Sequence, residues 1–257
     1  MSSIQIRDMQ PDDEYFVGTC SHVNESEEAD AVCRRRLVWL KKMEPGGLRV
    51  KVAVEDNKAL AFAYVMPIEI SPWGPLAEEL MVMNCLYVPQ DIKGRSIGRR
   101  LANAALEETR RQGRKGLVTE AYYWEFWFMP APYFEKLGFE VVTRKDNYAI
   151  LWMKLDETAR PPVKLKRNYT YQPVEGRVVV DLFHHSFCAT VNTEAQRVRE
   201  VCAEYGDKVV LNEYNADDPV VLRKHQIPRA IFVNGKEIGW GYEAPKDGIR
   251  KAIEEAG

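Results

Sequence analysis

The sequence predicts two consecutive α/β domains, and three observations point to them. Along the first 156 residues, runs rich in valine, isoleucine, methionine and tyrosine alternate with helical stretches. A stretch rich in proline and basic residues then interrupts the pattern, and a second alternation follows it. We therefore expect a larger domain at residues 1–156, a linker at 157–176 and a smaller domain at 177–257.

The elements of the first domain follow from its hydrophobic periodicity. A helix is expected first, over residues 29–42, and three strands after it, the first two joined by a polar turn at residues 55–58. An amphipathic helix follows that Gly113 ends, and a later short helix ends at Gly138. The expected strands are residues 49–54, 60–70, 80–88, 116–121, 139–143 and 149–155, and the two later helices are residues 97–112 and 132–137.

The second domain is predicted to follow the order strand, helix, strand, helix, hairpin, helix. Its hairpin turns at Asn234-Gly235, a dipeptide that favours tight turns between strands. Some strand character is also expected in the linker, near Tyr169–Tyr171. The expected strands are residues 178–183 and 208–215 with the hairpin at 230–239, and the helices are residues 194–205, 219–225 and 246–256.

Composition excludes several classes of protein. A formal net charge of -2 argues against a general nucleic-acid binder, although charge can still be local. No run of about 18 apolar residues occurs, so a membrane span is not expected. The five cysteines are an odd number without repeated spacing, which favours reduced thiols and a cytoplasmic protein. They are Cys20, Cys33, Cys85, Cys188 and Cys202.

The most informative motif joins a strand to an amphipathic helix through a basic turn. Gly94 and Gly98 leave room for a phosphate to approach the backbone, and the start of the helix adds a partial positive charge. The alternative is an ordinary strand-to-helix turn with a solvated basic face. The basic side chains available for phosphates are Lys93, Arg95, Arg99 and Arg100.

This segment resembles the acetyl-CoA loop of the GCN5-related N-acetyltransferase (GNAT) superfamily. Lys93, Ser96 and Gly98 stand at the positions of its consensus, with lysine for arginine and serine for the first glycine. The run at residues 133–139, Tyr-Phe-Glu-Lys-Leu-Gly-Phe, is similar to a second signature of that superfamily, and residues 4–7 fit its opening strand. The resemblance implies a mixed, mainly antiparallel sheet flanked by helices, with acetyl-CoA as cosubstrate. The cofactor contacts that it implies are Leu86, Tyr87, Val88, Lys93, Gly94, Arg95, Ser96, Ile97, Gly98 and Arg99.

The resemblance also indicates where the acyl-transfer chemistry is expected. An amide N–H around residues 86–88 would polarise the thioester carbonyl. The tyrosine that usually protonates the leaving thiolate is Phe134 here, and the adjacent Tyr133 need not point the same way, because a helix turns about 100° per residue. The catalytic candidates are therefore Glu120 as base, with Tyr122, Tyr123 and Tyr133 as proton donors. For Glu120 the alternative is an exposed carboxylate at a strand end, and Cys85 is interpreted as core packing.

The aromatic run at residues 122–130 has two interpretations. It falls where acceptor-binding walls lie in the superfamily, and an aromatic wall with one carboxylate suits an amine-bearing small molecule. Packing against the second domain would explain the same residues.

The second domain resembles a thioredoxin-like unit. Cys188 would then lie at the start of its first helix, where thiol pKa values are lowered, and Pro228 would match the cis-proline that faces the cysteine. Valine at 191 replaces the second cysteine of the usual Cys-x-x-Cys, so the resolving thiol is missing and disulfide oxidoreductase activity by the two-cysteine route is not expected. A monothiol role and a purely structural domain both remain open. His184 and His185 lie next to Cys188, but no second ligand cluster supports a metal site.

The order of the two domains, with Trp73-Gly74-Pro75 ahead of the cofactor strand, resembles the YoaP-like acetyltransferases. The favoured function is transfer of an acetyl group from acetyl-CoA to the amine of a small molecule or amino-acid-like acceptor. The alternatives are a non-catalytic acyl-CoA-binding sensor and a thiol- or ligand-binding protein centred on Cys188. No nucleic acid, membrane or metal is expected as a partner, and a homodimer is left open.

Overall fold

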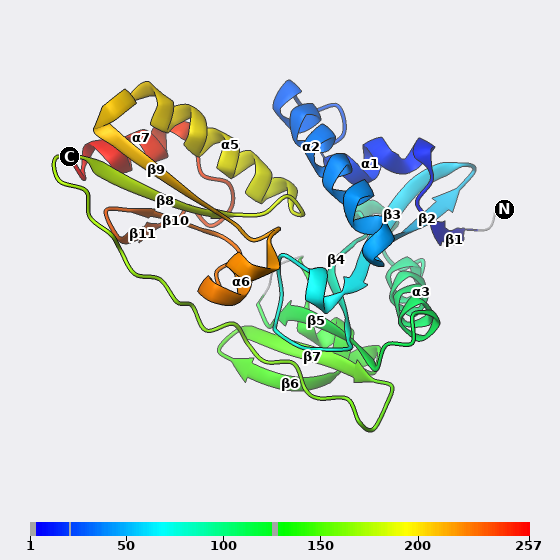
Figure 1. The fold of residues 1–257 in the computed structure, drawn as a ribbon. Helices are drawn as coiled ribbons and strands as arrows, with labels where there is room; N and C mark the ends of the chain where they lie inside the picture. The colour runs from blue at the N-terminus through cyan, green and yellow to red at the C-terminus, as the bar shows by residue number, and fades with distance from the viewer. Residues whose placement is uncertain (1–3, 21, 125–127) are drawn as a thin grey trace. The chain divides into compact units, whose positions relative to one another are not determined.

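The computed structural model describes residues 4–20, 22–124 and 128–257, and the chain falls into two compact units (Figure 1). The N-terminal unit comprises Met1–Val17 and Lys41–Leu165, and the C-terminal unit comprises Gly18–Leu40 and Lys166–Gly257. These bounds differ from the expected domains in two ways. An early segment, residues 18–40, belongs with the C-terminal residues. Residues 157–165, expected as linker, belong to the N-terminal unit, where Val163 and Leu76 exchange backbone hydrogen bonds of 2.8 and 2.9 Å.

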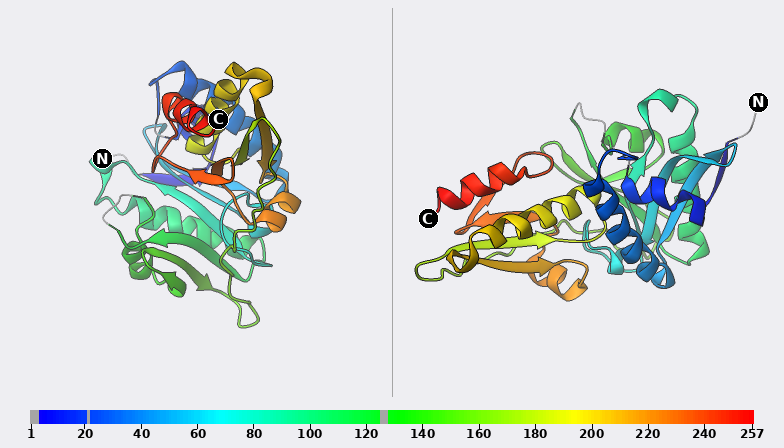
Figure 2. Two further views of the ribbon diagram at one scale, coloured as in Figure 1. Left: turned by 90° about the vertical axis from the view of Figure 1, so that its left-hand side faces the viewer. Right: turned by 90° about the horizontal axis from the view of Figure 1, so that it is seen from above.

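The N-terminal unit is built on a mixed, mainly antiparallel seven-stranded sheet flanked by helices, as expected (Figures 1 and 2). Its strand order is β1-β2-β3-β4-β5-β7-β6, and among the strands of the described residues only β4 and β5 run parallel to each other. The observed bounds lie close to the predicted ones, but β3 ends at a 3-10 turn instead of continuing to residue 70. The strands are β1 Gln5–Asp8, β2 Arg49–Glu55, β3 Lys58–Pro67, β4 Met81–Tyr87, β5 Gly116–Tyr122, β6 Glu140–Lys145 and β7 Tyr148–Lys154.

Strand β3 shows how the two faces of this sheet are divided. Side chains alternate between faces along a strand, so Ala61, Ala63 and Val65 share one face and Phe62 and Tyr64 share the other. The three small residues join the core beneath helix α3 (Ile97–Arg111), which packs on β2 to β5. The aromatic pair lies on the opposite face, where Phe62 contacts Phe16 and the Tyr64 hydroxyl donates to the Val17 carbonyl at 3.0 Å. Both come from helix α1 (Glu14–Thr19).

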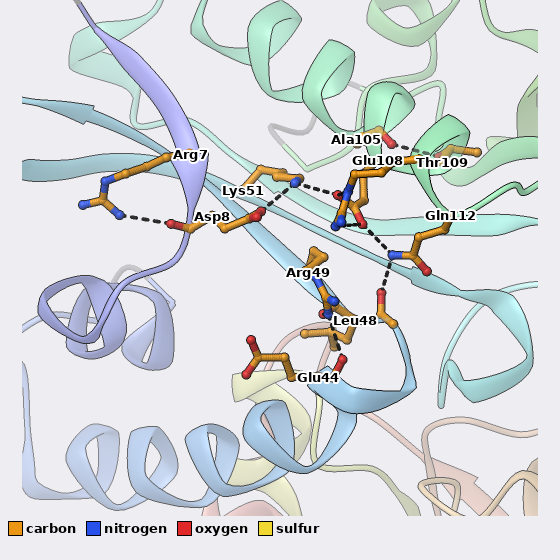
Figure 3. A network of polar contacts seen from close by, with 12 residues as sticks. Arg7, Asp8, Glu44, Leu48, Arg49, Lys51, Ala105, Glu108, Thr109 and Gln112 are labelled. Carbon is orange, nitrogen blue, oxygen red and sulfur yellow. Dashed lines mark hydrogen bonds and ion pairs between the residues drawn. The ribbon is translucent and has the colours of Figure 1, made fainter.

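A buried charge network fastens α3 to the edge of the sheet (Figure 3). Lys51 on β2 donates to Glu108 on α3 at 2.9 Å and to Asp8 on β1 at 2.5 Å. The Glu108 carboxylate also accepts from Arg111 and Gln112, both at 2.6 Å at the nearest. Burial alone would raise the pKa of Glu108, but these hydrogen bonds outweigh it and hold the pKa at about 2. Glu108 is therefore ionised at neutral pH, and its hydrogen bonds attach the C-terminal part of α3 to the sheet. The first turn of α3 is left available for other contacts.

The C-terminal unit contains a four-stranded sheet in the order β11-β10-β8-β9. Strands β8 and β9 are parallel, and the others are antiparallel. The predicted order of elements is present, and Asn234 and Gly235 both have positive φ, at 45° and 79°, as a tight hairpin requires. The elements are β8 Val178–His184, α5 Ala189–Glu204, β9 Val209–Asn215, α6 Pro219–His225, β10 Ala230–Val233, β11 Lys236–Ile238 and α7 Lys246–Glu254.

Two further segments complete this unit. Most of helix α2 (Glu27–Met43) belongs to it, since the division falls after Leu40. The segment at Tyr169–Tyr171 is not a strand; its side chains fasten it instead. Tyr169 stacks on Phe232 at 3.9 Å between ring centroids and donates to Asp181 at 2.7 Å. Along the described residues, no helix is both long and apolar enough to cross a membrane.

Candidate active site

The first feature of the site is the early separation of the two parallel strands. Pairing between β4 and β5 covers only Met81 with Leu117 and Val82 with Val118, although β4 continues to Tyr87 and β5 to Tyr122. The Thr119 hydroxyl donates to the Met83 carbonyl at 2.9 Å where that pairing stops. Beyond this point β4 still pairs with β3, and β5 still pairs with β7. The edges of β4 and β5 that face each other are therefore freed from sheet pairing over residues 84–87 and 120–121, and the Tyr122 amide donates to the Met129 carbonyl at 2.9 Å instead.

The turn after β4 brings backbone N–H groups together at the start of α3. Gly94 and Ser96 both have positive φ, at 87° and 59°, and no atom of the described chain lies within 4 Å of where a Cβ on Gly94 would stand. Ser96 is the N-cap of α3, and its carbonyl accepts from the Arg100 amide at 3.1 Å. The amides of residues 97–99 precede that first helical bond, so they point out of the helix end without intrahelical partners. The arrangement suits an anionic group.

The basic side chains of this turn separate into two pairs. Arg95 forms a two-pronged contact with Glu55, and Arg100 donates to the Ile4 carbonyl at 2.7 Å. Lys93 and Arg99 are exposed beside the same turn. A phosphate at the turn would therefore meet Lys93 and Arg99 first, whereas the expected contact from Arg95 requires its ion pair with Glu55 to open.

Tyr133 lies against the first turn of α3, and Phe134 does not. Both belong to helix α4 (Ala131–Lys136). Phe134 is 1% exposed in the core beneath α3, whereas the Tyr133 hydroxyl is so close to Gly98 that a Cβ there would collide with it. The Leu86 side chain reaches the same point. Burial raises the pKa of Tyr133, and the charge of Arg99 partly offsets this. A protonated phenol thus stands between the end of β4 and the start of α3.

Glu120 and its partners lie on the opposite face of the sheet. On β5, Glu120 and Tyr122 alternate with Ala121, which packs in the core beneath α3. The Tyr148 hydroxyl on β7 donates to Glu120, and the Trp73 side chain is a second donor to the same carboxyl group. Burial raises the pKa of Glu120, although Tyr148, Trp73 and the charge of Lys164 each pull it down. The result is a carboxylate whose basicity is increased.

Asn84 holds the loop that carries Trp73 against β4. Its buried side-chain amide donates to the Ser71 hydroxyl at 2.7 Å and to the Trp73 carbonyl at 3.0 Å. Because Asn84 lies just beyond the last paired residue of β4, the loop is attached where β4 and β5 begin to separate. This places the Trp73 indole within reach of Glu120 on the neighbouring strand.

Aromatic rings surround the Glu120 carboxyl group. Tyr122 stacks on Trp124 with centroids 4.8 Å apart, and it meets Tyr148 edge to face at 6.0 Å. Trp73 stacks on Phe128 at 6.2 Å. Of the aromatic run predicted as an acceptor wall, Tyr122, Trp124 and Phe128 belong to one cluster of aromatic rings, while Glu125, Phe126 and Trp127 lie outside the described residues. Rings around a carboxylate suit a substrate with an apolar body and a cationic nitrogen.

The other sequence candidates have different surroundings. Tyr123 lies on the other face of β5 from Glu120, where its hydroxyl donates to Glu135 at 2.9 Å and the Arg144 guanidinium covers its ring at 3.8 Å. Sequence reasoning missed Tyr148 and Lys164, whose ammonium lies 4.3 Å from the centre of the Tyr148 ring. Tyr148 lies directly opposite Tyr122 across the β5–β7 pairing, so knowledge of that register would have identified it.

Cys188 is where the sequence placed it, but its chemistry differs from the expectation. It is the N-cap of α5, as expected. Its pKa is nevertheless raised, because burial and the neighbouring Cys20 outweigh an amide of the helix and the charges of Arg36 and Arg229. The expected lowering was therefore wrong. A helix terminus contributes too little to offset the loss of solvation around this thiol.

The remaining residues near Cys188 also correct the expectation. The peptide before Pro228 is trans, so the match to a cis-proline fails; a trans bond is the lower-energy form, and the turn into β10 accommodates it. His184 and His185 turn to different partners. His184 lies 3.1 Å from Glu213, whereas His185 accepts the Cys188 amide at 3.4 Å. Within the described ranges, no group of three or more candidate ligands could hold a metal ion.

Comparison with known proteins gives structural neighbours only. No protein-family model matches the chain, and no curated protein sequence is significantly similar to it. A solved structure of a Desulfovibrio desulfuricans protein, assigned as a GNAT-family acetyltransferase, has a TM-score of 0.46 and 17% identity, covering 60% of this chain and 100% of its own. The yncA protein of Salmonella typhimurium, assigned as an acetyltransferase and solved with acetyl-CoA, has a TM-score of 0.46 and 20% identity over 62% of this chain and 97% of its own.

A third neighbour is the PaiA N-acetyltransferase of Thermoplasma acidophilum, solved with coenzyme A. It has a TM-score of 0.41 and 15% identity over 59% of this chain and 99% of its own. These neighbours are acetyltransferases of the kind that the sequence motifs suggested. The TM-scores of all three are below 0.5.

Proposed function

We propose that the N-terminal unit is an acetyl-CoA-dependent N-acetyltransferase of the GNAT kind that acts on a small amine. The observation that carries the proposal is the separation of β4 from β5 between a proton donor and a base. Tyr133 and the first turn of α3 lie on one face of the sheet, and Glu120 lies on the other, while its aromatic neighbours Tyr122 and Phe128 also reach the core beneath α3. Acyl transfer needs a donor at the leaving thiolate and a base at the attacking amine, and these two faces supply one each.

The residues around the turn fit the cosubstrate. Amides at residues 97–99, the open space at Gly94 and the exposed Lys93 and Arg99 together suit a pyrophosphate. When bound there, acetyl-CoA would supply an acetyl thioester. The edge of β4 at residues 86–88, which ends beside this turn, would direct a backbone N–H at the thioester carbonyl.

Each side chain then has a defined task. The Glu120 carboxylate removes a proton from the substrate ammonium, so that a neutral amine attacks, and its raised pKa makes it a better acceptor of that proton. The rings of Tyr122 and Trp124 hold the apolar part of the amine. Tyr133 donates its phenolic proton to the leaving thiolate, in place of the buried Phe134.

The test separates binding from turnover. Calorimetry with acetyl-CoA measures binding, and release of free thiol with a pooled library of small amines measures transfer. We expect micromolar binding, at about -8 kcal/mol, and turnover with a subset of the amines. Binding without turnover across the library would instead support the non-catalytic acyl-CoA sensor, and absence of binding would contradict both functions.

A further inference from the structure

The C-terminal unit brings a second cysteine toward Cys188. Cys20 belongs to this unit although it precedes most of the chain, and both thiols are partly exposed. The buried Arg36 side chain joins the two segments. Its Nε donates to the Phe187 carbonyl at 2.7 Å, and its Nη1 donates to the Gly18 carbonyl at 2.6 Å. Because a guanidinium is rigid and planar, these two carbonyls are held in fixed positions around one buried side chain.

The contacts of Arg36 fix the chain very close to each thiol. Phe187 directly precedes Cys188, and Gly18 lies two residues before Cys20. The Trp39 ring packs edge to face on Phe187 at 5.8 Å, which adds a second contact between the same two segments. The contact between residues 18–40 and the start of α5 is therefore part of the folded structure of this unit.

Electrostatics agree with this placement. The charge of Cys20 raises the pKa of Cys188, and the charges of both thiols act on Tyr242, whose pKa is also raised, chiefly by burial. Tyr242 hydrogen-bonds to Thr190 in the first turn of α5. Two thiols and one phenol thus gather around the N-terminus of this helix, with the Arg229 guanidinium also in range of Cys188.

We propose that Cys20 and Cys188 form a dithiol–disulfide couple that exchanges with low-molecular-weight disulfides such as glutathione disulfide. In this couple Cys20, which is distant in sequence, takes the place of the second cysteine that the Cys188-Ala189-Thr190-Val191 segment lacks. The inference concerns the C-terminal unit and does not depend on the acetyl-transfer function of the other unit.

The exchange is balanced in two steps. A thiolate of the pair attacks one sulfur of glutathione disulfide, which breaks its S–S bond, forms a mixed disulfide and releases one glutathione thiolate. The second thiolate then attacks the protein sulfur of that mixed disulfide, closes the Cys20–Cys188 bond and releases the second glutathione. Two protein thiols are oxidised, one glutathione disulfide is reduced to two thiols, and the two protons pass to the glutathione thiolates.

The experiment follows the fate of glutathione on the full-length reduced protein. The protein is incubated with glutathione disulfide near pH 9, where thiolates are populated, then alkylated, digested and examined by mass spectrometry. We expect a peptide pair linked through Cys20 and Cys188 in the wild type. In Cys20→Ser, glutathione should remain on Cys188, and in Cys188→Ser it should remain on Cys20.

Cys33→Ser is the matched control, because this buried cysteine lies in the same early segment. It should form the Cys20–Cys188 link as the wild type does. Three results would overturn the proposal: a glutathione adduct on Cys188 that persists equally in the wild type and in Cys20→Ser, a link between other cysteines, or native thiols that stay unreacted while the denatured protein reacts.

A bifunctional reagent provides a second measurement that does not depend on exchange kinetics. Phenylarsine oxide needs two neighbouring thiols, so the reduced wild type should bind one equivalent and each single variant, Cys20→Ser or Cys188→Ser, should lose it. Binding that survives in either variant would show that the two thiols do not act together.

Discussion

Glu120 in the N-terminal unit and Cys188 in the C-terminal unit are both partly buried, and burial is the main cause that raises the pKa of each. The same physical effect has opposite chemical consequences. A carboxylate with a raised pKa is a stronger base once it has lost its proton. A thiol with a raised pKa is mostly protonated there, so it is a poorer nucleophile. Burial alone therefore does not mark a reactive group.

The neighbours of the two groups sharpen the contrast. Glu120 is approached by side-chain donors, Tyr148 and Trp73, and by rings that can receive a substrate. Cys188 is surrounded by its own backbone, a neutral histidine and a second thiol; burial lowers the pKa of His185 to about 3. The environment of Glu120 favours proton transfer. The environment of Cys188 favours thiol–disulfide exchange that begins only after a thiolate has formed.

The largest effect is expected from Glu120→Gln. It removes the base without changing the size of the side chain, so kcat for amine acetylation should fall about 10²-fold or more, with the Kd for acetyl-CoA unchanged. In the wild type, activity should rise with pH as Glu120 loses its proton, through a pKa above the ordinary 4.5, and this limb should vanish in the variant. Glu135→Gln, at an exposed carboxylate, is the control. A retained limb would show that Glu120 is not the base.

The next effect should come from Arg36→Leu. It leaves the Gly18 and Phe187 carbonyls without their donor, and we expect a loss of about 3 kcal/mol in the free energy of unfolding of the C-terminal unit, measured by urea denaturation. Arg34→Leu, at an exposed position on the same helix, should change stability by only about 0.5 kcal/mol. Equal effects of the two substitutions would mean that Arg36 does not organise the Cys188 region.

Tyr133→Phe should lower kcat by about tenfold, less than the loss of Glu120, because a thiolate can leave without full protonation. Adding Phe134→Tyr to this variant should not restore activity, since residue 134 is enclosed in the core. Steady-state rates on the amine identified from the library measure both changes. Rescue by the second substitution would place the donor at residue 134.

A smaller, few-fold effect is expected on the alkylation of Cys188. Its rate with iodoacetamide should rise with pH and still be rising above the ordinary thiol pKa of 9.0, because a thiol with a raised pKa becomes fully ionised only at higher pH. Cys20→Ser removes a charge that raises this pKa, so the profile should move to lower pH. Mass spectrometry after brief alkylation gives the rate at each cysteine. A shift to higher pH would contradict the placement of Cys20.

The smallest effect is expected from Arg95→Ala. Its partner is the half-buried Glu55, and an ion pair with one exposed member contributes little to stability. We expect a change of about threefold or less in the Kd for acetyl-CoA by calorimetry, with larger changes for Lys93→Ala and Arg99→Ala. A greater loss for Arg95→Ala would show that its ion pair opens for the cosubstrate.

The sequence predicted local structure well and the distant partners poorly. The turn at Gly94 and Ser96 and the helix after it could be predicted because glycine, basic residues and helical periodicity act within a few residues. Tyr133 and Phe134 are adjacent on a helix, so the sequence also indicated that their side chains point in different directions. Only the contact at Gly98 shows that Tyr133 is the one that reaches the site. Nothing in the local sequence pattern aligns β7 with β5, so Tyr148 could not be placed beside Glu120.

The prediction of a lowered pKa for the Cys188 thiol failed for a different reason. A helix N-terminus is visible in sequence, whereas the burial of the thiol depends on residues 18–40, which lie far away along the chain. Neither Arg36 nor Cys20 belongs to a motif, and each gains its role only through the folded C-terminal unit.

The hydrogen bond from Arg36 to Phe187 spans 151 residues, and this has a consequence for folding during synthesis. On a ribosome that adds about 5–20 residues per second, residues 18–40 emerge roughly 8–30 s before the strands and helix that they must meet. Until then the apolar side of Trp39 and the Arg36 guanidinium have no C-terminal unit to pack against. A unit whose first segment is separated from the rest by an entire second unit has a high contact order, so the C-terminal unit should mature slowly and only after its last strands have been synthesised.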